Sequence, residues 1–163
     1  MAGSRRLDIL RHTVLDRLIG DENGPPSRTD LRIGVAELRA AVRRDLEWLL
    51  NTRLSFTAHL DPYPEAKRSM LAYGLPDLGA YSLASALDSG QICREMKLVI
   101  QTFEPRLAKR SIHVEFVPVD DITDFSMHFR ITGTIDVDPI REPVAFDTAM
   151  DKDRGTVTIE ETT

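Results

Sequence analysis

The spacing of apolar residues changes once along this 163-residue chain, and that change limits the folds open to it. Up to about residue 104 the apolar residues recur at helical spacing, whereas beyond residue 111 they alternate with polar ones. A helix with one apolar face and a strand with one apolar face can cover each other. The sequence therefore predicts an α+β domain, in which N-terminal amphipathic helices pack on one face of a small antiparallel β-sheet with a C-terminal hairpin.

Helical patterns fill most of the first 104 residues. Residues 34–51 place leucines and valines inward and arginines outward, and residues 4–19 form another amphipathic stripe. A further helix is expected to begin with Ser89 as its N-cap and to run into Phe103. One or two helical turns are expected around residues 65–72. These helices would supply the apolar cover for the sheet.

Short alternating runs follow and are predicted to be strands. Residues 112–116 and 125–131 predict two antiparallel strands. Residues 144–148 and 156–160 flank the turn-forming residues 151–155 and predict a terminal hairpin.

The length of the chain suits one domain with an apolar core. We expect a docking helix over residues 1–20, a tether over residues 21–33 that contains Pro25-Pro26, and one domain over residues 34–163. No apolar run reaches the roughly 20 residues that span a bilayer, and the start lacks the apolar segment of a signal peptide, so we expect a cytoplasmic location. The single cysteine, Cys93, excludes an internal disulfide.

Acidic residues concentrate toward the end of the chain. Residues 112–163 hold 4 Lys/Arg and 12 Asp/Glu, a net charge of −8, which leaves +3 for residues 1–111 out of the total of −5. Nucleic-acid phosphates need clustered cations, so this half is unsuited to a nucleic-acid partner. A basic protein surface is the expected partner.

The stretch FEPRL, residues 103–107, ends a predicted helix with a carboxylate, a proline and a guanidinium in succession. Proline fixes its own backbone angle and disfavours the helical angles of the residue before it. Glu104 and Arg106 are therefore expected to point in different directions from a rigid corner at Pro105. Such a corner suits an active site, a docking point or a simple helix stop, and the residues alone leave these alternatives open.

A peptidoglycan-cleaving, lysozyme-like glycosidase is one function that this corner would allow. Glu104 would act as the acid, with Asp77 or Asp88 as the second carboxylate. Arg106 argues against this role, because a nearby cation favours an ionised carboxylate whereas a general acid must hold its proton at neutral pH. The four histidines are scattered without ligand spacing. We therefore predict no enzyme activity, no cofactor and no metal.

The last β-branched run is a second candidate site. At a sheet edge its unpaired backbone groups would accept a partner's strand, as in a general strand-addition adaptor. An ordinary hairpin, in which Glu160 and Glu161 discourage association, is the alternative. The run consists of Thr156, Val157, Thr158, Ile159 and Glu160.

Several motifs occur in the order and spacing of one known family. They are LDRLIG at residues 15–20, RRDLEWLLNTR at 43–53, YGLPDL at 73–78, FEPRL at 103–107 and VAFDT at 144–148. From about Leu15 to Ile159 the chain thus resembles TssE, the baseplate subunit of type VI secretion systems. That family is related to a phage-tail baseplate wedge protein labelled lysozyme-like.

The resemblance implies a non-enzymatic structural protein that belongs to each baseplate wedge and helps to anchor or start the contractile sheath. It implies that Glu104, Pro105 and Arg106 form a docking element for the core bundle of other wedge subunits. It also implies that the strand edge at residues 156–160 takes up sheath subunits by strand addition.

The same resemblance implies the partners and the place of action. The wedge partners would be TssF, TssG and TssK, and the sheath partners TssB and TssC. Leu15, Leu18 and Ile19 of the first helix would contact a neighbouring subunit or pack on their own domain. The chain would be monomeric alone, without nucleic acid or membrane insertion, and would act in the cytoplasm at a baseplate docked to the inner-membrane complex.

Overall fold

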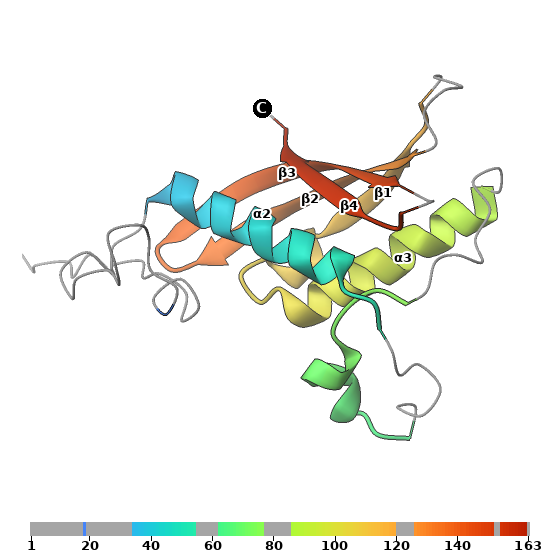
Figure 1. Cartoon of the computed structure of the whole chain (residues 1–163). Coiled ribbons are helices and arrows are strands. Elements are labelled where there is room, and N and C mark those ends of the chain that lie inside the picture. Colours follow the sequence, from blue (N-terminus) through green and yellow to red (C-terminus); the bar gives the residue numbers. More distant parts are fainter. Residues whose placement is uncertain are drawn as a thin grey trace, which may run out of the picture.

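In the part of the chain that the structure describes, the α-helices α2 and α3 are followed by an antiparallel sheet of four strands in the order β1-β2-β3-β4 (Figure 1). The computed structural model describes residues 18, 34–54, 62–76, 86–119, 126–151 and 154–162. The helices are α2 (Val35–Asn51) and α3 (Ala86–Phe103), and the strands are β1 (His113–Val117), β2 (Ser126–Val137), β3 (Ile140–Asp151) and β4 (Val157–Glu161). This arrangement confirms the predicted α+β class.

Helix α2 begins one residue later than predicted, ends at Asn51 as predicted, and has the predicted apolar face except at Val35, which is exposed. Gly34 is extended and donates its backbone N–H to Glu37 Oε2 at 2.7 Å, so the first turn is closed by a side chain that follows it. The buried side chains lie three or four residues apart along the helix, which places them on one face. They are Leu38, Val42, Leu46, Leu49 and Leu50.

Helix α3 begins earlier than the sequence predicts. It starts at Ala86, so Ser89 lies buried inside the helix and its predicted role as N-cap is wrong. Asp88 in the first turn favours the earlier start, because an acidic side chain is stabilising at the positive end of a helix. The turns expected around residues 65–72 are present as the 3-10 helices η1 (Ala66–Arg68) and η2 (Met70–Ala72).

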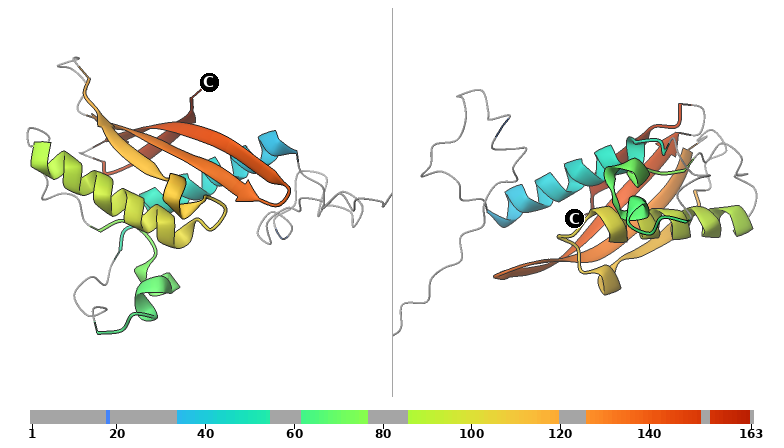
Figure 2. Two further views of the ribbon diagram at one scale, coloured as in Figure 1. Left: turned by 180° about the vertical axis from the view of Figure 1, so that it is seen from behind. Right: turned by 90° about the horizontal axis from the view of Figure 1, so that it is seen from below.

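The sheet is built around a long hairpin. β2 and β3 pair over their whole twelve-residue lengths, from Ser126 opposite Asp151 to Val137 opposite Ile140. β1 and β4 are five residues long and pair with β2 and β3 respectively. The hairpin therefore extends well past its two neighbours (Figure 2). The terminal hairpin β3–β4 is confirmed, but both central strands are longer than predicted.

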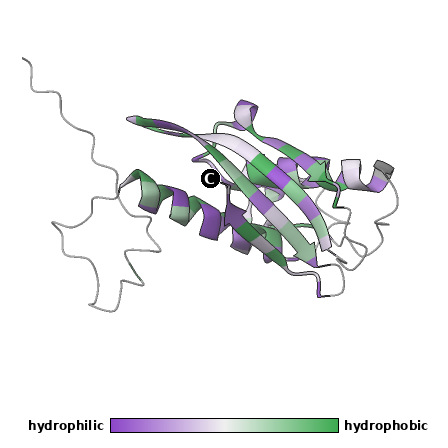
Figure 3. Cartoon of the chain, turned by 90° about the horizontal axis from the view of Figure 1, so that it is seen from above, coloured by the Kyte–Doolittle hydropathy of each residue, from purple (hydrophilic) through white to green (hydrophobic). Residues whose placement is uncertain are grey.

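Both helices lie on the same face of the sheet, α2 beneath β3 and β4 and α3 beneath β1 (Figures 1 and 2). Hydrophobic and hydrophilic bands alternate along the long strands when the sheet is seen from above (Figure 3). The inward set includes Phe129, Ile131 and Phe146, all at most 1% exposed. The core thus forms between one sheet face and the two helices, as the alternation requires.

Most of the predicted docking helix and the tether lie outside the described residues, as do Leu15 and Ile19. Leu18 is helical and its side chain is 77% exposed. None of the helices in the described ranges has the length and apolar character needed to span a bilayer.

Candidate functional site

The corner at Glu104, Pro105 and Arg106 is tied to the fold at both ends. Glu104 donates its backbone N–H to Ile100 O at 2.9 Å, which makes it the last residue held by α3. Two residues later the Arg106 carbonyl accepts the N–H of Asp136 in β2 at 2.8 Å. Pro105 stands between these anchors with its ring exposed. The corner is therefore a fixed turn between helix and sheet.

The two charges of the corner turn toward each other. Arg106 Nε donates to Glu104 Oε1 at 2.7 Å, and the Arg106 backbone N–H donates to the same oxygen at 3.0 Å. Arg106 Nη2 donates to Glu104 Oε2 and also to Asp45 Oδ2 of α2, the latter at 2.7 Å. The prediction that Glu104 and Arg106 point in different directions is therefore wrong. The Glu104 side chain is only 4% exposed, and a buried carboxylate requires a partner.

This ion cluster, Asp45, Glu104 and Arg106, is largely removed from water. The Arg106 side chain is 18% exposed. Burial by itself lowers the pKa of a guanidinium, but the hydrogen bonds and charge of Glu104, followed by those of Asp45, raise the pKa of Arg106 above its ordinary value. Arg106 is therefore a permanent cation, and its charge is compensated within the chain by Glu104 and Asp45.

An aromatic hollow of about 420 Å³ adjoins the ion cluster. The Tyr73 ring meets the Phe103 ring edge to face, with centroids 5.3 Å apart. Trp48 is 45% exposed and lies under the Arg44 guanidinium, 4.9 Å from its ring centroid. Burial, then the charges of the two carboxylates in the ion cluster, raise the pKa of Tyr73, so its hydroxyl stays protonated. The lining residues are Asp45, Trp48, Leu49, Tyr73, Phe103, Glu104, Pro105 and Arg106.

The geometry does not suit Asp88 as the second carboxylate of the glycosidase alternative. Asp88 precedes Glu104 by 16 residues along α3, about 24 Å at the rise of a helix. Paired glycosidase carboxylates lie about 5–9.5 Å apart, so Asp88 is too distant to serve. Asp77 lies outside the described residues. Among the described residues, no group of three or more His, Cys, Asp or Glu is placed to hold a metal ion.

The second predicted site, β4, lies at the edge of the sheet as expected, because among the described strands it pairs with β3 and no other. Its outer backbone groups are nevertheless not all unpaired. Asn51 at the end of α2 donates Nδ2–H to Val157 O at 2.7 Å and accepts the Val157 N–H at Oδ1, at 2.8 Å. Arg43 Nη1 donates to Ile159 O at 3.2 Å. The expectation of a bare strand edge is therefore wrong for Val157 and for the carbonyl of Ile159.

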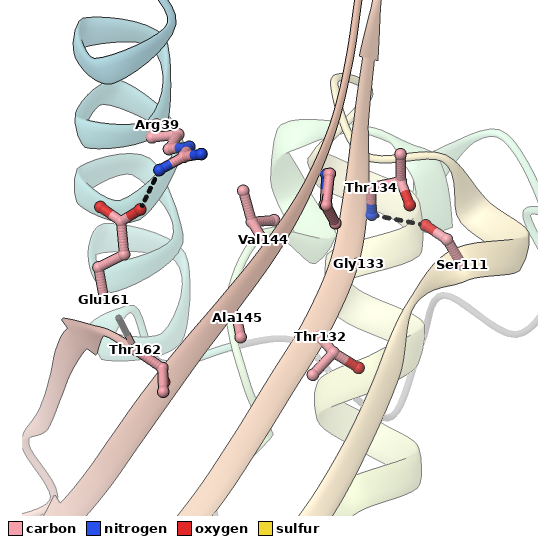
Figure 4. Close-up of a pocket in the computed structure, with 10 residues that line it drawn as sticks. Arg39, Ser111, Thr132, Gly133, Thr134, Val144, Ala145, Glu161 and Thr162 are labelled. Carbon is pink, nitrogen blue, oxygen red and sulfur yellow. Dashed lines mark hydrogen bonds and ion pairs between the residues drawn. The ribbon is translucent and has the colours of Figure 1, made fainter.

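A second hollow of about 730 Å³ opens where β4 ends (Figure 4). Arg39 of α2 pairs with Glu161 at one side of it, at 3.1 Å. On the other side Ser111 Oγ accepts the Thr134 N–H at 2.8 Å. Val144 points into the space between them. Arg39 also pairs with Glu142 of β3, so one arginine joins α2 to both terminal strands.

The residues that complete these sites were not predicted from the sequence. Asp45, Trp48 and Asn51 come from α2, and Tyr73 follows η2, all far along the chain from the corner or from β4. A signal was present, since these residues fall in the motifs RRDLEWLLNTR and YGLPDL. The motifs mark the residues but do not say which of them meet.

No curated protein and no solved structure matches the chain. The match to a known family covers residues 36–140, which include all of α2 except Val35, the corner and all of β2. That family is the one to which TssE belongs, so the resemblance of the motifs is confirmed. The matching family model is that of the baseplate wedge protein gp25, and the chain belongs to this family of structural proteins of the baseplate.

Proposed function

We propose that the chain is a wedge subunit of a type VI secretion baseplate, which docks to other wedge subunits and starts or anchors the contractile sheath by strand addition. The observation that carries the proposal is the fixed corner beside an aromatic hollow, in a member of the baseplate wedge family. A half-exposed tryptophan beside a hollow, as at Trp48, is a feature of the anchor points of protein interfaces.

The three corner residues have different roles in this proposal. Pro105 and the hollow form the contact surface, into which a partner places an apolar side chain. Glu104 is buried, and Arg106 donates hydrogen bonds through Nε to Glu104 and through Nη2 to Asp45. These two residues act as positioning residues, because they hold the corner at Pro105 and tie it to Asp45 of α2, the helix that also carries Trp48.

The proposed partners for the corner are the wedge subunits TssF, TssG and TssK, and those for the β4 edge are the sheath subunits TssB and TssC. The proposed place of action is the cytoplasmic baseplate docked to the inner-membrane complex. Leu15, Leu18 and Ile19 are proposed to dock on a neighbouring subunit, which agrees with the exposure of Leu18. No described feature favours the glycosidase or a general adaptor over this role.

The corner is tested by sheath assembly in cells that carry Trp48→Ala or Pro105→Ala. Both side chains are exposed enough for the fold to survive, which thermal unfolding of each purified variant checks. Leu98→Ala is the matched control, because Leu98 is a 59% exposed apolar residue of α3 that does not line the hollow. We expect sheaths to fail in the two corner variants and to form in the control. Normal sheaths in both corner variants would refute docking at this surface.

The strand edge is tested separately by photo-crosslinking in cells. A benzophenone amino acid replaces Glu160, which is exposed on β4, or Arg68, which is exposed on η1 and serves as the control. We expect a crosslink to a sheath subunit from position 160 and not from position 68. If position 160 yields no sheath crosslink in cells that assemble sheaths, β4 is not the site of strand addition.

A further inference from the structure

The backbone groups of β4 face alternately toward β3 and toward the outer edge of the sheet, as in any antiparallel pair. The Thr162 N–H donates to Ala145 O at 3.0 Å. In β4 and just after it, the backbone N–H and C=O groups of the even-numbered residues therefore face β3. The N–H and C=O groups of Val157 and Ile159 therefore point outward. These are the groups that an added strand would have to bind.

Asn51 occupies both outward groups of Val157. A carboxamide carries one acceptor oxygen and donor hydrogens on its nitrogen, so it can replace the peptide group of a neighbouring strand. Its bonds to Val157 are 2.7 and 2.8 Å long and partly buried. Asn51 Nδ2 also donates to Glu47 O at 2.8 Å, one turn back in α2, which holds the side chain in this orientation. Val157 thus pairs with a side chain that imitates a strand.

Neighbouring side chains continue this pattern along the edge. Arg43 binds the outward carbonyl of Ile159, and Arg53, just beyond α2, donates to Gly155 O at 2.8 Å. Arg39 binds the carboxylate of Glu161, as Figure 4 shows. Every second residue from 155 to 161 is therefore held by α2 or by the residues that directly follow it. Helix α2 thus runs antiparallel to β4 along its outer edge, so that later residues of the helix hold earlier residues of the strand.

We infer that Asn51 and Arg43 form an edge latch, which closes the outer edge of β4 in the isolated subunit and which an incoming strand must displace. The latch deepens the proposed function, since it rests on that function for the identity of the natural strand, a segment of a sheath subunit. An open edge invites pairing with any exposed strand, a second copy of this chain included. Side chains that hydrogen-bond to the outward backbone groups of the edge prevent such pairing without adding a strand.

The two latch residues differ in how they can respond. Neighbouring strands lie about 4.8 Å apart, so an added strand would push the latch side chains outward by about that distance. The long Arg43 side chain can follow and bind the outer edge of the new strand, whereas the short Asn51 side chain cannot. Strand addition at Val157 is therefore an exchange, in which the N–H and C=O of the incoming peptide replace the amide of Asn51.

The test measures binding of a generic strand to the purified chain. The probe is a fluorescent, acetylated and amidated peptide of sequence KVTVTVK. Its control is the same peptide N-methylated at alternate residues. We expect Asn51→Ala with Arg43→Ala to bind the probe roughly tenfold or more tightly than the unchanged chain, because each bond removed from the edge no longer competes. Arg154→Ala, which removes an exposed arginine of the β3–β4 turn, should change nothing.

The outcomes separate the latch from the proposed function. If the double variant remains folded by thermal unfolding and binds the probe no better than the unchanged chain, there is no latch. A gain that the N-methylated peptide also shows would overturn it as well, because that peptide cannot pair as a strand. If the double variant does not fold, Arg43→Ala alone is tested in its place, and we expect it to bind the probe more tightly than the unchanged chain, by a smaller factor than the double variant. A gain in probe binding without a sheath crosslink from position 160 leaves the latch and removes the proposed sheath role.

Discussion

Replacing Arg106 by alanine should destabilise the fold strongly, although the residue lies at a turn. The change removes the guanidinium that donates to Glu104 through Nε and Nη2 and to Asp45 through Nη2. The Glu104 carboxylate, with a side chain 4% exposed, would remain buried with one backbone N–H donor. Breaking a buried pair by removing one partner costs about 3–5 kcal/mol. For a chain of this size that cost corresponds to a fall in Tm of roughly 6–20 °C.

The reasoning is checked by urea unfolding of Arg106→Ala beside the double variant Glu104→Gln with Arg106→Ala. Glutamine has nearly the shape of glutamate without its charge, so the double variant no longer buries an uncompensated carboxylate. We expect it to recover at least about 1 kcal/mol of the loss, because an unpaired buried charge costs more than an unpaired buried amide. A loss below about 1 kcal/mol in Arg106→Ala, or a double variant that is no more stable than the single one, would refute this account of the ion cluster.

Further predictions concern a backbone position and a titrating pair. Gly74→Ala should lower the free energy of unfolding in urea by about 1–3 kcal/mol, because Gly74 has φ of 114° and an added Cβ would lie 2.4 Å from Thr52 O. Gly90→Ala inside α3 should instead raise the free energy of unfolding by about 0.5–1 kcal/mol. Equal effects of the two changes would contradict the assignment. The hydrogen bond from Arg130 lowers the pKa of Asp147. The ion pair therefore stabilises the folded chain fully above the ordinary aspartate pKa of about 3.9, and this stabilisation is lost as the pH falls through the lowered pKa. Arg130→Ala should return the pKa of Asp147 toward its ordinary value in an NMR titration, and an unchanged titration would show that the pair does not form in solution.

Periodicity alone was sufficient to predict the helical part of the core. Leu38, Val42 and Leu46 of α2 are buried as predicted, because a helix has a fixed angle per residue and the stripe in the sequence maps directly onto one face. Val35 in the first turn was also predicted to face inward, and this prediction is wrong, since Val35 is 36% exposed. The alternation after residue 111 likewise placed Phe129 and Ile131 in the core. These features depend only on residues close together in the chain.

The lengths of the central strands were harder to predict, because Gly133 and Pro143 interrupt the alternation and are unusual inside strands. In the folded chain they lie in the part of the hairpin that extends past β1 and β4, where the outer side of β3 needs fewer backbone donors. Tertiary position therefore overrides the local preference of these residues.

The candidate sites depend on contacts between distant segments, which no local pattern contains. Asp45 and Arg106 are 61 residues apart, and Asn51 and Val157 are 106 apart. From the sequence, Glu104 and Arg106 were expected to diverge, since proline chemistry describes the backbone but not the burial of the carboxylate. The corner was found as a motif, and its geometry required the fold.

Helix α2 contributes to both proposed contact surfaces, and this has a mechanical consequence. Its 17 residues form a rod about 26 Å long. Asp45 and Trp48 border the corner, while Arg43 and Asn51 hold the strand edge. A tilt or rotation of the rod that frees the edge therefore also moves the floor of the hollow. If strand uptake moves the rod in this way, the proposed wedge docking and the proposed strand uptake would be thermodynamically coupled, and each would change the equilibrium affinity of the other by the same factor. Through one helix, a subunit already seated in its wedge would differ from a free subunit in its readiness to receive the sheath.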